Sequence, residues 1–205
     1  MKDDKNLIGI IDYGGSNLKS VFNAFNKLNI VCEICDDYSK LDKYDKLILP
    51  GVGAFELASK QLKANGFFNK IIDKVNSGTP ILGICLGMQL LLNSSEEYGY
   101  SKGMGLIDGE VKSFKNIGVN PHIHMGWNDI KITNNSNILG EGNETYYFVH
   151  GYYCDIKEQE FVAAKVHHGL SFDVAYERNN IFAVQFHPEK SQKNGLSLLK
   201  KFANL

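Results

Sequence analysis

The chain has 205 residues, 43% of them hydrophobic, and a net charge of -1 at pH 7. This length and composition predict one domain, residues 1–205, with a sizeable core. Charges of both signs are spread along the chain, which argues against nucleic acid or an anionic membrane as a partner. The first apolar run, residues 7–11, is too short for a signal sequence or a membrane span. The four scattered cysteines do not form a disulfide framework, so we expect a cytoplasmic protein.

Short apolar runs alternate with helical periodicity through the first half of the chain. The run at 7–11 ends in a glycine turn, and a helical repeat follows it. Further strands are expected at 31–34, 46–49 and 81–84, and helices at 18–28, 67–75 and 86–92. Buried strands that alternate with amphipathic helices predict an α/β fold whose mostly parallel sheet is covered on both faces.

The pattern changes after about Gly103, where short segments rich in Tyr, Phe, Val and Ile are separated by Asn, Gly and Asp. Such segments are typical of antiparallel strands and turns, so we expect an antiparallel, β-rich C-terminal flank on the sheet. Residues 133–137 read as an exposed loop, and the apolar spacing over 195–202 predicts a closing helix.

A candidate nucleophile lies at a strand-to-helix junction, in the sequence Gly83-Ile84-Cys85-Leu86-Gly87. This is the cysteine version of the G-x-S-x-G nucleophile elbow, in which a sharp turn exposes the nucleophile above the sheet and the glycines provide space. The positive end of the following helix favours a thiolate there. The alternative is a buried cysteine that only packs, as free cysteines commonly do.

A candidate base and its orienting acid follow the apolar run 181–186, in the sequence His187-Pro188-Glu189. Residues two apart in an extended segment point the same way, and Pro188 holds the preceding histidine extended. A histidine base needs a partner on its second nitrogen, and Glu189 can be that partner. Alone, such a pair is commonly a surface feature, and the existence of a candidate nucleophile elsewhere in the chain gives it its significance.

Backbone donors for an oxyanion are expected at the same edge of the sheet. The turn Gly51-Val52-Gly53 follows a predicted strand and can present N–H groups, and the Leu86 N–H at the start of the elbow helix can add another. Glycine turns after strands are common, so the turn is significant because of its location.

Six motifs in order resemble the class I (triad) glutamine amidotransferases and cover nearly the whole chain. They are Ile11-Asp12-Tyr13-Gly14 with Asn17-Leu18, Pro50-Gly51-Val52-Gly53-Ala54-Phe55, Gly83-Ile84-Cys85-Leu86-Gly87-Met88-Gln89, His124-Met125-Gly126-Trp127-Asn128, Tyr147-Phe148-Val149-His150, and Gln185-Phe186-His187-Pro188-Glu189-Lys190-Ser191.

The resemblance implies the family's flavodoxin-like fold and assigns roles to matching positions. Cys85 would attack the side-chain amide of L-glutamine, His187 would shuttle the proton and Glu189 would orient the histidine. Glutamine would be bound by Gln89 and by His150-Gly151-Tyr152, whereas Asn17, Trp127, Asn128 and Lys190 would face a partner. The family chemistry implies no metal and no organic cofactor.

More closely, the motifs are similar to those of the glutaminase subunits of imidazole glycerol phosphate synthase. That similarity implies a heterodimer with a (β/α)₈ cyclase subunit, which uses the ammonia in histidine biosynthesis. The sequence departs from the family pattern in three places. Asn120-Pro121-His122-Ile123 stand before His124, where the family has a lysine, an apolar residue and a proline. Gly151 replaces a residue with a hydroxyl group, and His168-Gly169 replaces a Tyr-Gly pair. These departures leave open a paralogue that supplies ammonia for a sugar nucleotide of a surface glycan.

One pair of cysteines and one pair of histidines are weaker signals of a metal site. Cys32 and Cys35 have C-x-x-C spacing but no second pair, and they read better as part of a strand. His122 and His124 could share one face of a strand, yet a metal site would need a third ligand. Two rivals to the glutaminase are a thiol peptidase or amidase that acts without a partner, and a catalytically silent binding subunit.

Overall fold

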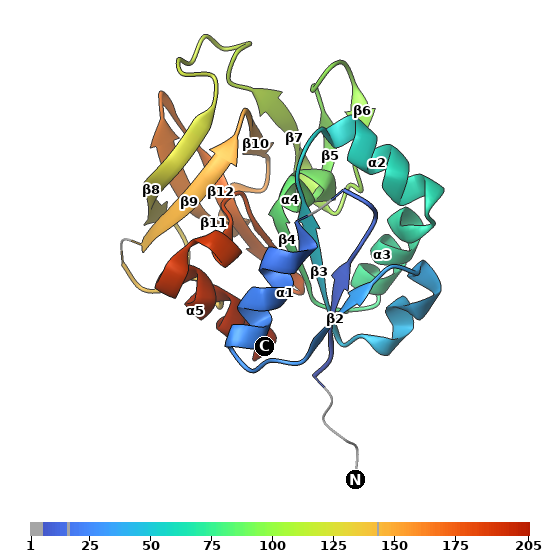
Figure 1. Cartoon of the computed structure of the whole chain (residues 1–205). Helices are drawn as coiled ribbons and strands as arrows, with labels where there is room; N and C mark the ends of the chain where they lie inside the picture. The colour runs from blue at the N-terminus through green and yellow to red at the C-terminus, as the bar shows by residue number, and fades with distance from the viewer. Residues whose placement is uncertain (1–5, 16, 143) are drawn as a thin grey trace.

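The computed structural model describes residues 6–15, 17–142 and 144–205 of the chain. Figure 1 shows a central sheet with helices on both faces of its N-terminal half. The parallel part of the sheet has the order β2-β1-β3-β4-β13. Its strands are β1 Ile8–Ile11, β2 Cys32–Cys35, β3 Lys46–Gly51, β4 Ile81–Cys85 and β13 Ile181–Val184. All but β2 are buried along their whole length, as unbroken apolar runs predict.

Two helices cover one face of this sheet and three cover the other. Helices α1 (Leu18–Lys27) and α5 (Gln192–Ala203) share one apolar cluster with β1 and β4, to which Phe25 and Phe202 contribute. Helices α2 (Phe55–Ala64), α3 (Phe67–Asn76) and α4 (Leu86–Leu91) share the second cluster. The predicted helices at 18–28, 67–75 and 195–202 are confirmed within two or three residues at each end.

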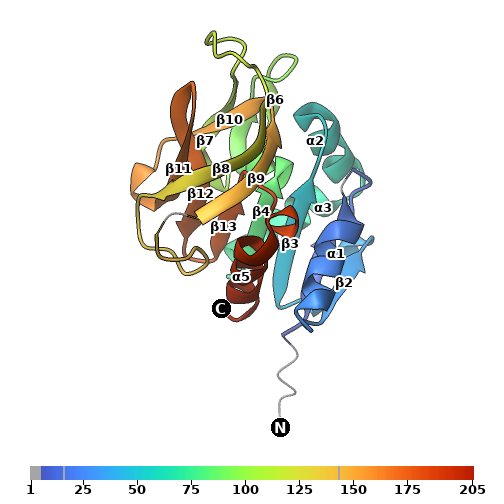
Figure 2. The same cartoon turned by 60° about the vertical axis from the view of Figure 1, so that its left-hand side comes forward.

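An antiparallel flank continues the sheet beyond β13. Figure 2 shows it on the side of the molecule away from α1 and α3. Strands β12 (Leu170–Arg178), β10 (Tyr152–Ile156), β7 (Ile107–Ser113), β5 (Leu92–Ser95) and β6 (Ser101–Lys102) follow in that order, although β5 and β7 run parallel. A branch through β11 (Val162–His168), β8 (His124–Ile132) and β9 (Glu144–His150) packs beside them. The expected β-rich flank is therefore confirmed.

Local details differ from the sequence-based expectation, which also contained no helix at the position of α2. The predicted helix 86–92 ends at Leu91, because Leu92 starts β5 and pairs with Ile107 of β7. Short 3-10 helices, which the apolar pattern did not predict, occur at η1 (Tyr38–Lys43), η2 (Gln159–Phe161) and η3 (Pro188–Lys190). Residues 133–137 lie outside the helices and strands and are largely exposed, as expected.

The carboxyl ends of β3, β4 and β13 meet at one edge of the sheet. Gly51 is in register with Cys85, and Val184 is in register with Ile84. The elbow, the glycine turn and the His-Pro-Glu segment, which are far apart in the sequence, therefore converge where open α/β sheets bind ligands. None of the helices in the described ranges is long and apolar enough to cross a membrane.

Candidate active site

Cys85 occupies the sharp turn that the elbow pattern predicts. Its backbone has φ 55° and ψ -110°, an unfavourable conformation for a residue with a side chain, and α4 begins at the next residue. The flanking glycines are needed for space. A Cβ on Gly87 would lie 1.7 Å from the carbonyl oxygen of Leu49, and one on Gly83 would lie 2.9 Å from the Met88 nitrogen. The surrounding structure thus holds the cysteine in its strained turn.

His187 and Glu189 form a buried pair beyond the end of β13. His187 Nδ1 lies 2.8 Å from Glu189 Oε1, and the two side chains are only 3% and 2% exposed. The backbone also anchors this segment, because the His187 N–H donates to the Tyr147 carbonyl at 2.9 Å and the Ser191 hydroxyl donates to the His187 carbonyl at 2.6 Å. The contact with Glu189 places the Nδ1 proton of the imidazole against the carboxylate and leaves Nε2 for a second partner.

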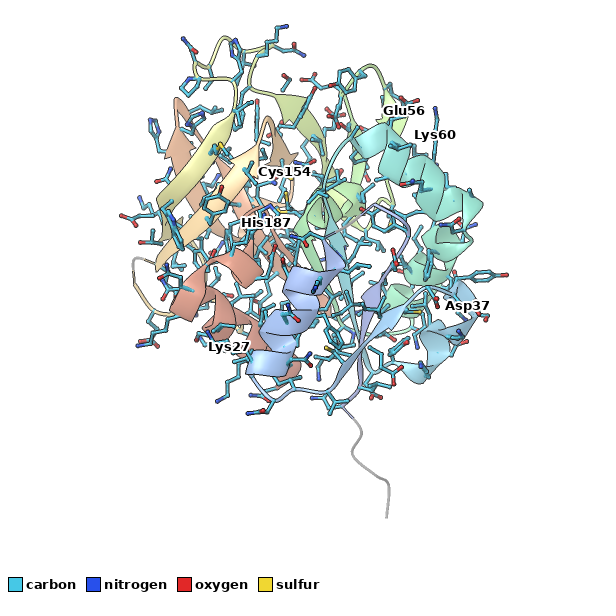
Figure 3. All side chains as sticks on the ribbon, viewed as in Figure 1. Lys27, Asp37, Glu56, Lys60, Cys154 and His187 are labelled. Atoms are coloured by element: carbon cyan, nitrogen blue, oxygen red, sulfur yellow. The ribbon has the colours of Figure 1, made fainter. Side chains whose placement is uncertain are left out.

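Electrostatics favour a protonated His187. Burial by itself lowers its pKa, but the Cys85 thiolate and the Glu189 carboxylate outweigh burial and raise the pKa to about 9. A histidine held in this way can give a proton to a leaving group and take it back from water. Figure 3 shows His187 in the middle of the molecule, whereas Lys27, Asp37, Glu56 and Lys60 lie at its periphery.

A pocket of about 290 Å³ opens over the nucleophile. It is lined by Val52, Gly53, Cys85, Leu86, Gln89, Glu97, Val149, His150, Gly151, Tyr152 and His187. The structure therefore gathers every residue that the sequence assigned to substrate binding except Gly51, whose backbone packs beneath the pocket against Leu86 and the Tyr13 hydroxyl. Glu189 lies behind His187 and does not line the pocket.

The glycine turn holds its central N–H away from the nucleophile. The Val52 N–H donates to the Gly15 carbonyl at 3.3 Å. Sequence analysis expected this N–H as an oxyanion donor, and in the structure it is engaged by a neighbouring loop instead. The Leu86 N–H, in the first turn of α4, has no partner within its own helix. Gly53 has φ +93°, so the turn contains a residue that permits a change of backbone conformation.

Two pocket residues were not identified from the sequence. Glu97 is 7% exposed, and its Oε2 accepts the backbone N–H of Phe55, the first residue of α2, at 2.6 Å. Burial raises the pKa of Glu97. Val149 lines the wall from β9. The pair Glu96-Glu97 stands in a polar segment that reads as an exposed turn, and its sequence carries no signal for burial.

A third unassigned residue is Gln185, which is fully buried directly beneath the pocket. Its Oε1 accepts from Gln89 Nε2 at 3.0 Å, and its Nε2 lies 3.7 Å from the Cys85 sulfur. The Cys154 thiol contacts the same Oε1 at 3.8 Å. Gln185 begins the last of the six sequence motifs, but only the fold brings it against Cys85 and Gln89.

A chain of neutral imidazoles supports the far wall of the pocket. His150 Nδ1 lies 2.7 Å from the Tyr152 carbonyl, which can only accept, so this nitrogen carries the proton. His150 Nε2 must then accept from His124 Nδ1 at 3.0 Å, and His124 Nε2 accepts from the Asn128 amide at 3.1 Å. Burial lowers the pKa of His150 to about 3 and that of His124 to about 4, which keeps both rings neutral.

The residues expected to face a partner lie mostly at the surface. Asn17 and Lys190 are exposed, and Trp127 is 49% exposed. The Trp127 and Tyr147 rings contact each other edge to face, and the Lys190 ammonium lies over the Tyr147 ring. Asn128 is half-buried and turns its amide inward, toward His124 and the His167 carbonyl.

The cysteine and histidine pairs with weak metal-site spacing do not form metal sites in the described residues. Cys32 and Cys35 are buried free thiols at the two ends of β2 and belong to different apolar clusters. His124 is held by His150 and Asn128, whereas His122 is exposed and its Nδ1 lies 2.6 Å from the Val119 carbonyl. In the described parts of the chain, no three side chains of His, Cys, Asp or Glu are grouped so that they could hold a metal ion.

Known proteins share this fold, and a family model matches nearly the whole chain. A family model described as glutamine amidotransferase class-I matches residues 9–204. A structure of PurLQS from Thermotoga maritima superposes with a TM-score of 0.76 at 19% identity and covers 97% of each chain. A crystal structure described as a glutamine amidotransferase gives a TM-score of 0.73 at 19% identity, over 97% of this chain and 99% of that one. These two similarities show the fold.

Relatives that are closer in sequence share one description. The imidazole glycerol phosphate synthase subunit HisH of Syntrophotalea carbinolica is 44% identical over 97% of this chain and 100% of its own length. The subunit of the same name from Chlorobium chlorochromatii is 45% identical over the same shares. The chain therefore belongs to the class I glutamine amidotransferases, a family of enzymes, and within it to the HisH subunits of imidazole glycerol phosphate synthase.

Proposed function

We propose that this chain hydrolyses L-glutamine to glutamate and ammonia, with Cys85 as nucleophile, and delivers the ammonia to a (β/α)₈ cyclase subunit in a heterodimer. One observation carries the proposal: Cys85, His187 and Gln89 line a single pocket together with the buried Glu97. A carboxylate and an amide in this pocket are suited to an amino acid, and a thiol beside a protonated histidine is suited to acyl transfer.

The reaction consists of two acyl transfers. The Cys85 thiolate attacks the carboxamide carbon of glutamine, and His187 gives its proton to the departing nitrogen as the C–N bond breaks. Ammonia leaves and a thioester remains on the sulfur. Water then attacks the thioester and gives its proton to His187, which releases glutamate and restores the thiolate. Glu189 keeps the imidazole oriented through both steps.

The oxyanion formed in each step needs hydrogen-bond donors. The Leu86 N–H is one of them. The Val52 N–H becomes the second when the Gly51–Val52 peptide turns away from the Gly15 carbonyl. Such a turn makes hydrolysis depend on a partner that favours the rotated peptide, which limits the loss of glutamine when no acceptor is present. Trp127 and Lys190, at the surface near Tyr147, are the residues we assign to that partner contact.

The names of the relatives support one destination for the ammonia. Because ammonia is largely protonated near neutral pH, it must reach its acceptor within a complex. We assign the role of acceptor to the cyclase of imidazole glycerol phosphate synthase, in the histidine pathway and in the cytoplasm. The free state of all four cysteines agrees with a reducing compartment.

A glutaminase assay with and without the cognate cyclase tests this proposal. We expect slow hydrolysis alone, a marked rise with the cyclase and its nucleotide ligand, and no hydrolysis by Cys85→Ala. The matched control is Cys32→Ala, which removes a buried thiol in β2 and should hydrolyse normally. Glutamate release by Cys85→Ala at the parent rate would overturn the assignment of the nucleophile. Co-purification with a sugar-nucleotide enzyme in place of the cyclase would overturn the assignment of the acceptor.

A further inference from the structure

Gln185 is a fully buried amide to which neither the triad nor the pocket lining assigns a role. It follows the last residue of β13, and its own backbone N–H donates to the Val174 carbonyl at 2.9 Å. Its side chain therefore starts from a fixed point of the sheet. An amide at this depth needs partners for both its oxygen and its nitrogen, and the partners that it has are Gln89, Cys154 and Cys85.

The direction in which each amide faces follows from one carbonyl group. The Tyr152 carbonyl can only accept, so the end of Gln89 that lies 3.4 Å from it must be the NH₂ nitrogen. The same nitrogen lies 3.0 Å from Gln185, which must therefore present its oxygen. The remaining end of Gln185, directed at the Cys85 sulfur, is then its NH₂ group. The Cys154 thiol agrees with this assignment, because it can donate to the Gln185 oxygen.

Gln185, oriented in this way, acts on a neighbour at each end of its amide. Both hydrogens on the Gln89 nitrogen are used, one by Tyr152 and one by Gln185, so Gln89 has only its oxygen left for a ligand. That oxygen accepts from N–H groups, such as those of the ammonium or the carboxamide of L-glutamine. At the other end, an N–H directed at the sulfur of the buried Cys85 stabilises a thiolate.

We propose that Gln185 is a positioning residue that makes Gln89 a pure hydrogen-bond acceptor in the pocket and places an N–H donor on the Cys85 sulfur. The proposal rests on the proposed function, in that it treats Cys85 as the nucleophile and L-glutamine as the ligand. A role in packing alone would require buried volume at this position and no particular polar groups, and the two roles can be separated by experiment.

The first experiment measures alkylation of Cys85 by iodoacetamide in the chain alone, by mass spectrometry, at a fixed mildly acidic to neutral pH. Gln185→Met keeps the volume and removes the amide. Because the variant loses a hydrogen bond that supports a charged sulfur, alkylation should slow about tenfold. The matched control is Val184→Ala, a buried change at the last residue of β13 that leaves the amide in place, and it should be alkylated at the parent rate.

The second experiment measures binding by the protection that L-glutamine gives Cys85 against alkylation. Gln185→Met should raise the half-protecting concentration of glutamine about tenfold. Gln89→Met should do the same, and the double variant should be no worse than Gln89→Met, because Gln185 acts on the ligand only through Gln89. Additive losses in the double variant would overturn this part of the proposal.

Parent-like alkylation and protection in Gln185→Met would refute the proposal as a whole. If that variant does not fold, as judged by circular dichroism, Gln185→Asn is used, because its shorter amide cannot reach both Gln89 and Cys85 and should show the same losses. Failure of the proposed function has a different signature. Glutamine would then protect no variant, including the parent, while the alkylation rates would still report whether Gln185 supports the Cys85 sulfur.

Discussion

The neutral pair His124 and His150 should make the fold sensitive to acid, and His124→Asn isolates this effect. Their folded-state pKa values, about 4 and about 3, lie below the value of 6.5 for an exposed histidine. The unfolded chain therefore binds more protons than the folded chain below pH 6.5. The contribution of each histidine to stability is complete above that pH, and it is lost as pH falls toward the folded-state pKa.

The size of the effect follows from these pKa values. Between about pH 7.5 and pH 5 the unfolded imidazole becomes protonated while the folded imidazole stays neutral. Each histidine then lowers the free energy of unfolding by up to about 1.4 kcal/mol per pH unit, or about 2 kcal/mol over this range. The Asn side chain can replace the Nδ1–H donor toward His150 without titrating. His124→Asn should thus reduce the pH dependence of stability by about 2 kcal/mol between the two pH values.

Urea denaturation at several pH values between about 5 and 7.5 measures this difference. Val166→Ala, a buried apolar change in β11, serves as control, because it should lower stability by the same amount at every pH. If His124→Asn and the parent lose stability in parallel as pH falls, His124 is not held neutral by burial, and the tautomers assigned to the histidine chain are wrong.

Two further predictions concern the elbow and the base. Gly87→Ala should prevent stable folding or lower the free energy of unfolding by more than about 4 kcal/mol, because its Cβ would lie 1.7 Å from the Leu49 carbonyl oxygen. The control is Gly151→Ala, whose Cβ would lie 3.5 Å from the His122 carbonyl oxygen, and it should change the free energy of unfolding by less than about 1 kcal/mol. Urea denaturation compares the two variants. Glu189→Gln should lower the pKa of His187 from about 9, because it removes a carboxylate that favours the imidazolium. NMR titration of the His187 ring measures the change. An unchanged pKa would contradict the role given to Glu189.

Local patterns predicted the fold and part of the site because their causes are local. The alternation of apolar runs and helical repeats reflects burial on both faces of a parallel sheet, and β1, β3 and β4 formed close to the expected positions. The elbow around Cys85 was recognisable because the glycine spacing reports a steric need within one turn. These features depend on neighbours in the sequence or on burial alone.

Glu97 and the orientation of Val52 could not be predicted because their causes are distant in the sequence. The burial of Glu97 depends on the first N–H of α2, which the fold brings to its carboxylate. The direction of the Val52 N–H depends on the Gly15 carbonyl, in a loop after a different strand. In each case the position of a polar group depends on a hydrogen-bond partner that only the tertiary structure brings close.

The Tyr152 carbonyl joins the two polar networks of the site. It accepts from His150 at 2.7 Å and from Gln89 at 3.4 Å, so both of its lone pairs are used. From this one acceptor the hydrogen bonds extend outward through His124 to the half-buried Asn128 and inward through Gln185 to the Cys85 sulfur. Each donor in this series is determined by the acceptor that it meets, so no single amide or imidazole can reverse without placing two donors or two acceptors against each other. Protonation of His150 would place two N–H groups against each other at His124, and the series would then break on the side that supports the pocket wall. The tautomers of the two histidines and the acceptor character of Gln89 are therefore two consequences of the same backbone carbonyl.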